Sequence, residues 1–161
     1  LNRFAKLMRS TLENSEKLKI NLKDSIEYLT NYVEIEKLRF KEDFDFEISF
    51  EGEEAPELLQ VPPMLIQPFV ENAIIHGLVP SQKTKMLKIE FIEEDNFLVC
   101  KIKDNGKGFE TETQNKTHNS KGLKMIQTYF DLWNVQKNEK ASFSIQSQVG
   151  EGTEVLIQIP I

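Results

Sequence analysis

The spacing of hydrophobic residues along the chain predicts four helices. Near the N-terminus, Phe4, Leu7, Met8 and Leu12 lie one to four positions apart on one stripe, which is the pattern of a helix with one buried side. We expect this segment to be the end of a longer helix. The other predicted helices cover residues 24–40, 64–77 and 122–133.

The predicted helix at residues 24–40 carries apolar residues on two faces. One face holds Ile26, Leu29, Val33 and Phe40, and the other holds Tyr28, Tyr32 and Ile35. Two apolar faces indicate a helix that is covered on two sides. The second face packs either against a helix of a partner or, together with the first face, in one core within the chain.

Alternation of apolar and polar residues predicts the strands. Residues 43–52 read DFDFEISFEG, which has the period of a half-buried strand. Two strands are expected at residues 86–92 and 96–104 around the turn EEDN, and a final hairpin at residues 142–161 around the turn GEG. Because most strands are joined as hairpins, we predict an α+β fold, a two-layer α/β sandwich. Its mixed, mostly antiparallel sheet should be covered on one face by helices and preceded by a helical segment.

Proline residues bear on where the helix at residues 64–77 begins. The connector at residues 53–63 is rich in turn-forming residues and ends in Pro63, which suits the first turn of a helix. Pro68 lies inside the same apolar run, where it either kinks the helix or marks a later start.

Composition narrows the class of protein. A chain of 161 residues with 39% hydrophobic and 29% charged residues is typical of one main globular domain. The net charge of -6 argues against a nucleic-acid surface, which needs clustered cations. Cys100 lies in the apolar run FLVCKI, so a buried, inert thiol is expected. No apolar stretch is long enough to span a bilayer, and because Leu1 is not an initiator residue we expect a fragment whose membrane part, if any, lies elsewhere.

Four short motifs follow one another in a distinctive order. ENAIIHG at residues 71–77 precedes DNGKGF at residues 104–109, SKGL at residues 120–123 and GEGT at residues 150–153. One glycine pair alone is an ordinary turn signal. The order of all four resembles the Bergerat-type ATP-binding fold of the GHKL superfamily, which includes histidine kinases, type II topoisomerases and the mismatch-repair protein MutL. Within it, NYVEIEKLRF followed by VPPMLIQPFVENAIIHG is similar to the LytS-type branch of bacterial sensor histidine kinases.

The resemblance implies that this chain binds ATP and Mg²⁺. It implies that Asn72 helps to hold Mg²⁺ between the triphosphate oxygens, a task that suits a neutral amide oxygen because phosphate supplies the charge. Asp104 is expected to accept a hydrogen bond from the adenine amino group. Gly106 and Gly108 are expected to let the backbone pass against the nucleotide, where a Cβ would occupy the space of the ring or ribose.

Other matching positions complete the expected nucleotide site. Gly122 opens the helix after a polar loop, so its backbone N–H groups and the helix dipole are expected to face phosphate. The hydroxyl of Thr153 is expected to bond the base or an ordered water. We also expect nucleotide contacts from His76, Lys121 and Leu123. Residues 110–121, which contain no large apolar side chain, are predicted to form a mobile lid.

The candidate catalytic residues are Glu71 and Asn72. Glu71 either acts as a base, orients Asn72 or sits on the helix surface, and the sequence leaves these readings open. Relatives often have glutamate, lysine, glycine and arginine where this chain has Pro68, Ile75, Ser120 and Tyr129. Phosphate contacts are then fewer, or are supplied by Lys107, Lys121 or Lys124. Neither His76 nor His118 matches the phosphoacceptor of the family, which we expect before Leu1.

The resemblance also implies a role for the whole protein. Residues 1–40 are expected to be the C-terminal part of a helical dimerisation and phosphoacceptor module, and residues 41–161 the catalytic ATP-binding domain. The whole protein is then a homodimeric sensor kinase of the inner membrane, with this part in the cytoplasm. It would pass the γ-phosphate of ATP to an upstream histidine and on to a response regulator, for which the LytTR type is a candidate, whereas this fragment alone is expected to be inactive. The alternatives are a catalytically decayed nucleotide-binding or protein-interaction module and an ATP-hydrolysing clamp related to MutL.

Overall fold

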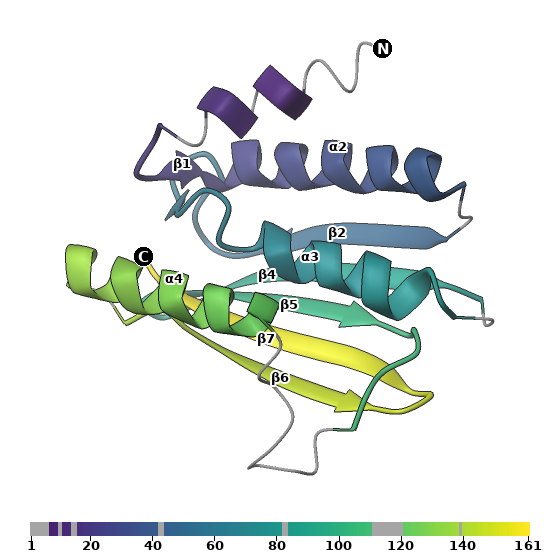
Figure 1. Cartoon of the computed structure of the whole chain (residues 1–161). Coiled ribbons are helices and arrows are strands. Elements are labelled where there is room, and N and C mark those ends of the chain that lie inside the picture. The colour runs from purple at the N-terminus through teal and green to yellow at the C-terminus, as the bar shows by residue number, and fades with distance from the viewer. Residues whose placement is uncertain are drawn as a thin grey trace.

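A five-stranded sheet with helices packed on one face forms the body of the molecule (Figure 1). The computed structural model describes residues 7–9, 11–13, 16–41, 44–81, 84–110, 121–138 and 140–161. The helical elements are α2 (Leu22–Phe40), α3 (Gln67–Asn72), the π-helical turn η1 (Ala73–Leu78) and α4 (Lys121–Lys137). The strands are β1 (Ile20–Asn21), β2 (Asp45–Glu51), β3 (Gln60–Val61), β4 (Met86–Glu94), β5 (Phe97–Asp104), β6 (Ser142–Gln148) and β7 (Gly152–Pro160).

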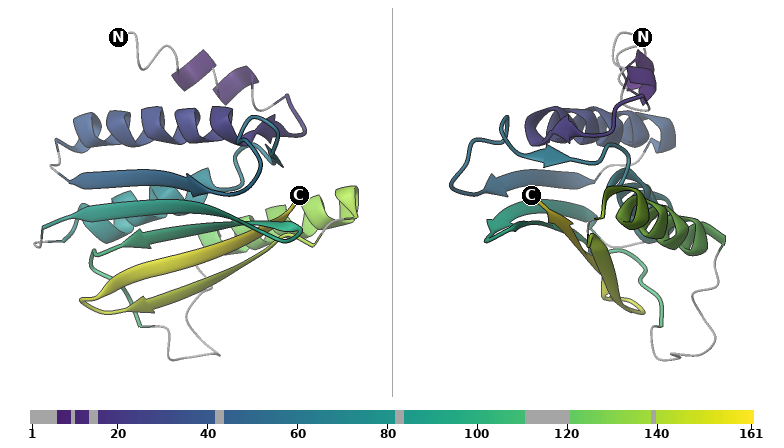
Figure 2. Two further views of the ribbon diagram at one scale, coloured as in Figure 1. Left: turned by 180° about the vertical axis from the view of Figure 1, so that it is seen from behind. Right: turned by 90° about the vertical axis from the view of Figure 1, so that its left-hand side faces the viewer.

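The main sheet is mixed, as predicted. Its strand order is β2-β4-β5-β7-β6, in which β2 lies parallel to β4 and every other neighbouring pair is antiparallel. The hairpins β4–β5 and β6–β7 were expected from their turns. The side view in Figure 2 shows α4 along one face of this sheet and the other face open. The predicted α+β sandwich is therefore confirmed.

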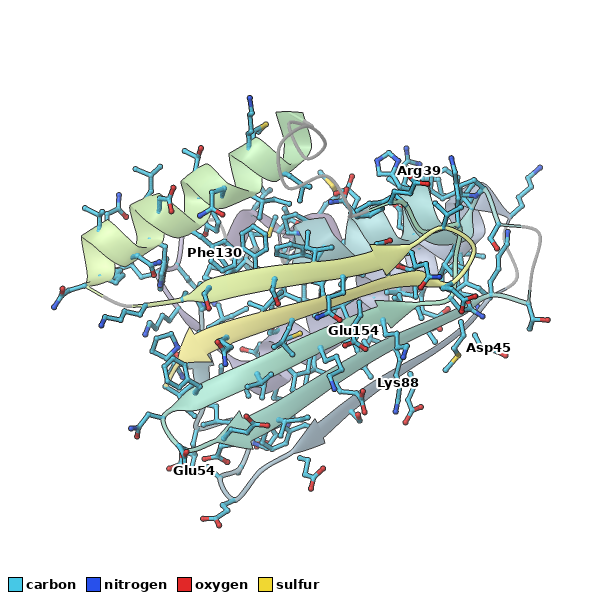
Figure 3. All side chains as sticks on the ribbon, turned by 90° about the horizontal axis from the view of Figure 1, so that it is seen from below. Arg39, Asp45, Glu54, Lys88, Phe130 and Glu154 are labelled. Atoms are coloured by element: carbon cyan, nitrogen blue, oxygen red, sulfur yellow. The ribbon has the colours of Figure 1, made fainter. Side chains whose placement is uncertain are left out.

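Alternation along the strands separates a buried face from an open face. In β4 the side chains of Leu87, Ile89 and Phe91 are buried, whereas Lys88 and Glu90 between them form an ion pair with 2.9 Å between Nζ and Oε1. Figure 3 looks onto the open face, where Lys88 and Glu154 are labelled. The buried face packs against the helices because this contact removes apolar side chains of both layers from water.

Cys100 of β5 is fully buried, as the sequence predicted. Burial raises the pKa of its thiol well above the usual range, because the thiolate would lose its hydration. Cys100 therefore stays protonated at neutral pH and serves as a small core residue.

Helix α2 is covered on both of its apolar faces within the chain. Leu29 and Val33 of the first face are buried, and so are Tyr28 and Tyr32 of the second. The hydroxyl group of Tyr28 donates a hydrogen bond to Oε1 of Gln67 at 2.7 Å and lies 3.1 Å from the hydroxyl of Thr11, in the N-terminal helical residues 11–13. Of the two readings of this helix, the structure thus favours one core within the chain.

Helix α3 begins later than Pro63 would suggest. The helix starts at Gln67 with Pro68 in its first turn, so the late start is confirmed and the helical role of Pro63 is wrong. Met64 has a φ angle of 65°, which breaks any helix continuing from Pro63. After Asn72 the helix widens into η1, where the backbone N–H of Val79 donates to the carbonyl of Ile74 at 2.9 Å.

Two regions differ from the sequence prediction or fall outside it. The short antiparallel pair β1–β3 was not predicted, and it holds the start of α2 against the connector before α3. The predicted lid at residues 110–121 lies outside the described residues except for Glu110 and Lys121. Within the described ranges, none of the helices has the length and apolar character that a membrane crossing requires.

Candidate functional site

A cavity of about 350 Å³ lies between the helical layer and the sheet. Its walls come from α3 and η1, from β5, β6 and β7, and from the start of α4. Most of the lining is apolar, with Phe69, Ile102, Leu123, Ile145 and Val155 among the lining residues. A concave apolar cavity with a few polar groups is the usual form of a small-molecule site.

Among the residues that the structure describes, Asp104 is the only carboxylate lining this cavity. It ends β5, and its side chain is 3% exposed. Burial raises its pKa from 3.8 to about 6, because the charged form is desolvated, although the backbone N–H groups of Gly106 and Thr153 partly offset this. The hydrogen bond from Gly106 to Oδ1 is 2.9 Å long. Asp104 therefore offers a buried acceptor with a fixed orientation.

Two glycines make room for this carboxylate. A Cβ on Gly77 would lie 2.6 Å from Oδ1 of Asp104, closer than a carbon atom can approach an oxygen atom. A Cβ on Gly106 would collide with the backbone carbonyl of Gly77. Gly106 therefore has a reason within the chain, because its missing side chain admits the backbone of η1, and its expected approach to a nucleotide stays a prediction.

The loop after Asp104 is fixed by backbone contacts on both sides. The N–H of Lys107 donates to the carbonyl of Gly77 at 2.9 Å, and the carbonyl of Lys107 accepts from the N–H of Gly150 at 2.7 Å. Gly108 lines the cavity with a φ angle of 60°, and a Cβ there would collide with the carbonyl of Gln148. The hairpin backbone therefore gives Gly108 a reason within the chain, and its expected approach to a nucleotide stays a prediction.

Three polar residues form one row across β5, β7 and β6. Asp104 pairs with Thr153, and Thr153 pairs with Ser147. The hydroxyl oxygen atoms of Ser147 and Thr153 are 2.8 Å apart. Ser147 also donates to the carbonyl of Gly152 at 3.0 Å and accepts from the N–H of Phe109 at 2.9 Å. Thr153 itself lines the cavity beside Asp104.

The start of α4 closes one side of the cavity. Gly122 and Leu123 line it, and a Cβ on Gly122 would meet nothing within 4 Å. Gly122 is therefore not required by packing against the rest of the described chain. Lys121 begins the helix, but its side chain lies outside the described residues.

A larger groove of about 960 Å³ adjoins the cavity and shares Asn72 and Gly122 with it. Glu71, Lys17 and Lys124 are the charged residues among its lining. Tyr129 lines it too, and its hydroxyl donates to the carbonyl of Pro63 at 3.2 Å. Tyr129 thus ties α4 to the segment before α3.

The structure brings most of the predicted site residues together. Of these, Asn72, His76, Asp104, Gly108, Gly122, Leu123 and Thr153 line the cavity, Gly106 lies behind Asp104, and Glu71 faces the adjoining groove. Their roles toward a nucleotide stay predictions. Among the residues that the structure describes, no group of three or more His, Cys, Asp and Glu side chains is placed to hold a metal ion.

Sequence reasoning missed Gly77 and Ser147. Gly77 ends the motif ENAIIHG, yet only the folded chain shows that Asp104 lies against it. Ser147 could have been found by counting outward from the hairpin turn, because pairing of Gln148 with Gly152 places Ser147 opposite Thr153.

Comparison with known proteins gives a consistent result. A family model described as "Histidine kinase" matches residues 1–44. The chain is 27% identical over 158 residues to the sensor protein LytS of Bacillus anthracis, covering 94% of this chain and 26% of the relative. The sensor protein LytS of Oceanobacillus iheyensis is 32% identical over 110 residues, covering 68% of this chain and 18% of the relative. The chain thus spans about a quarter, or less, of the length of these curated relatives.

Two solved structures with a similar fold are histidine kinase domains. The catalytic domain of histidine kinase ThkA superposes with a TM-score of 0.61 at 15% identity, covering 88% of this chain and 93% of that domain. A histidine kinase domain from Erythrobacter litoralis, from a blue-light activated kinase, gives a TM-score of 0.55 at 14% identity, covering 83% of this chain and 59% of that domain.

Proposed function

We propose that this chain, which is related in sequence to LytS-type sensor histidine kinases and has the fold of histidine kinase catalytic domains, binds ATP in the cavity around Asp104. The observation that carries the proposal is the buried carboxylate of Asp104 in an otherwise mostly apolar cavity. Its carboxylate accepts from the backbone N–H groups of Gly106 and Thr153, and its remaining lone pairs can accept from a ligand in the cavity. The amino group of adenine is a suitable donor, and the apolar walls suit a planar ring.

The size and chemistry of the site fit a nucleotide. A volume of about 350 Å³ falls in the range of small-molecule cavities and suits a nucleoside more than a whole triphosphate. The phosphates would leave the cavity past Asn72 and Gly122, which also line the adjoining groove. Lys17 and Lys124 line that groove and supply positive charge.

Asn72 is the residue that would hold Mg²⁺ together with phosphate oxygens. Its amide side chain lies where cavity and groove meet, and Mg²⁺ commonly uses one or two protein oxygens beside substrate phosphates. When bound, the ion supplies charge neutralisation for the transferred phosphoryl group. The neighbouring Glu71 lines the groove, and its three readings as base, orienting group or surface residue stay open.

For the whole protein we propose a two-component sensor kinase. Residues 41–161 form the ATP-binding domain, and residues 1–40 the end of the dimerisation and phosphoacceptor module. The γ-phosphoryl group would pass to a histidine elsewhere in the protein, because residues 1–44 contain none, and then to an aspartate of a response regulator. We propose that this part lies in the cytoplasm and that the helical segment mediates a homodimer. The name "sensor protein" of the LytS relatives and the "Histidine kinase" family model support this reading.

Isothermal titration calorimetry with ADP and ATP, with and without Mg²⁺, tests the binding step. We expect saturable binding that Asp104→Ala weakens by about tenfold to a hundredfold, since a hydrogen bond to a charged group contributes roughly 1.5 to 3 kcal/mol. A matched control is Asp131→Ala, because Asp131 is an exposed carboxylate on α4. Absence of binding by the natural chain would leave the decayed, protein-interacting module as the better reading.

The transfer step needs a second experiment with labelled Mg-ATP. This chain alone should acquire no acid-labile phosphate, whereas the longer natural protein should acquire it on a histidine outside residues 1–161. Label on His76 or His118 of this chain would contradict the proposed position of the acceptor. Binding without any label on the longer protein would show that the catalytic function has been lost.

A further inference from the structure

The hydroxyl group of Ser147 of β6 contacts Phe109, Gly152 and Thr153 among the described residues. Its oxygen accepts from the backbone N–H of Phe109 at 2.9 Å, and the hydroxyl donates to the carbonyl of Gly152, with 3.0 Å between the oxygen atoms. The third contact, at 2.8 Å, is to the hydroxyl of Thr153. A serine hydroxyl has one hydrogen to donate and two lone pairs to accept with.

The direction of the hydrogen bond between Ser147 and Thr153 can be inferred from the other two contacts. Ser147 donates its only hydrogen to Gly152, and Phe109 uses one of its lone pairs. The remaining lone pair can form the third bond only if Thr153 is the donor. Thr153 then has no hydroxyl hydrogen left for the cavity and presents lone pairs to a ligand.

Thr153 does not stand alone at this wall of the cavity. It is the cross-strand partner of Asp104, so both side chains lie on the same face of the sheet as close neighbours. Both residues line the cavity, and Asp104 is an acceptor when ionised. Two acceptors side by side favour a ligand group that carries two hydrogens, and they repel a ligand carbonyl oxygen.

We propose that Ser147 is a positioning residue: by accepting from Thr153 it turns the lone pairs of that hydroxyl toward the cavity, so that Thr153 and Asp104 together select a base that bears an amino group. This inference rests on the proposed nucleotide function. Ser147 contacts Thr153 and does not line the cavity. It acts on selectivity only through Thr153.

Selectivity between ADP and IDP tests the inference, because hypoxanthine carries a carbonyl oxygen where adenine carries its amino group. Affinities are measured by calorimetry on the full chain. In Ser147→Ala the Thr153 hydroxyl is free to rotate and donate to that carbonyl, so the preference for ADP over IDP should fall by about threefold to tenfold, the worth of one neutral hydrogen bond. Ser147→Thr keeps a hydroxyl at the same place and should retain the natural preference.

Two controls separate this effect from a change in the loop or the strand. Ser144→Ala removes an exposed hydroxyl from the same strand and should leave the ratio unchanged. In the Thr153→Val background, Ser147→Ala should have no further effect on the ratio, although it still removes the tether to Phe109. The free protein gives a readout without ligand, since NMR couplings should show one Thr153 rotamer in the natural chain and averaging in Ser147→Ala.

The outcomes distinguish this inference from the function on which it rests. A natural chain that binds neither nucleotide would overturn both. Binding of ADP with an unchanged ratio in Ser147→Ala would overturn the inference alone. An equal change of the ratio in the natural and Thr153→Val backgrounds would also overturn it, because the effect would then travel through Phe109.

Discussion

Gly77 of η1 lies directly against Asp104 of β5, so that a Cβ on Gly77 would come within 2.6 Å of Oδ1. The carboxylate is buried, and the N–H of Gly106 holds its Oδ1 in this place. The last glycine of the motif ENAIIHG therefore leaves space that the side chain of Asp104 occupies.

Gly77→Ala should therefore displace Asp104 from its position. We expect a loss of roughly 1 to 3 kcal/mol in the free energy of unfolding, which is typical when a methyl group is forced into a packed site. ADP affinity should fall at least tenfold, because the displaced carboxylate no longer meets the base. Urea unfolding followed by Trp133 fluorescence and calorimetry measure the two effects. Gly122→Ala is the matched control, since its Cβ meets nothing within 4 Å and it should unfold no more easily than the natural chain.

The charge of Asp104 should reduce the stability of the folded chain at neutral pH. Its folded pKa of about 6 is above the reference value of 3.8, so the stabilisation that protonation gives is present below about pH 4 and is lost as pH rises through 6. A shift of about 2 pKa units at 1.36 kcal/mol per unit corresponds to about 3 kcal/mol. Asp104→Asn should be more stable than the natural chain at pH 7.5 by up to this amount, and the gap should close toward pH 4. A variant that is less stable at both pH values would show that the carboxylate stabilises the fold.

The same carboxylate should make nucleotide binding depend on pH. Adenine donates to the ionised form, so ADP affinity should fall as pH drops below about 6, by up to tenfold per pH unit. The phosphate groups of ADP titrate in the same pH range. Asp104→Asn serves as the reference, because it keeps every titrating group except Asp104. Equal pH profiles for the natural chain and Asp104→Asn would mean that the ionised carboxylate does not read the base.

Much of the fold could be predicted because its elements have a clear period. The alternation in β4 and β5 and the turn between them gave that hairpin, and its register follows from the turn. The position of β2 did not follow, since a parallel partner separated by a long connection leaves no local signal. The two-residue strands β1 and β3 are too short to show any period.

The sequence predicted which residues form the candidate site better than it predicted the contacts that those residues make. Glycine spacing indicated that backbone must approach something closely, but not that Gly106 meets Gly77 and Gly108 meets Gln148. Such contacts join segments far apart in sequence, and a local pattern cannot reveal them. From the sequence, Tyr129 was noted only as a replacement for the arginine that relatives often have. Its hydrogen bond to Pro63 depends on how α4 packs, which the sequence does not show.

Tyr129→Phe tests whether that tyrosine is structural. Loss of its bond to the carbonyl of Pro63 should lower the free energy of unfolding by about 0.5 to 1.5 kcal/mol, the usual net worth of a hydrogen bond. Mg-ATP affinity should stay within about twofold, because the hydroxyl is engaged with protein backbone. The control is Thr128→Ala, at a neighbouring position whose hydroxyl bonds within its own helix to the carbonyl of Lys124. A selective loss of ATP over ADP affinity in Tyr129→Phe would instead assign the hydroxyl to the γ-phosphate.

Asn72 should matter for nucleotide binding mainly when Mg²⁺ is present. Its amide lies on α3 where the cavity meets the groove, whereas Asp104 and Thr153 belong to strands, so Asn72→Ala would remove the proposed metal ligand and leave those two residues in place. The increase in ATP affinity that Mg²⁺ produces should shrink by about tenfold, whereas ADP binding in EDTA should change less than about twofold. Glu71→Gln is the companion variant: an unchanged Mg²⁺ effect is expected if Glu71 is a surface residue, and a partial loss if it orients Asn72. Circular dichroism must show that α3 is intact, and an equal loss with and without Mg²⁺ would contradict the metal role of Asn72.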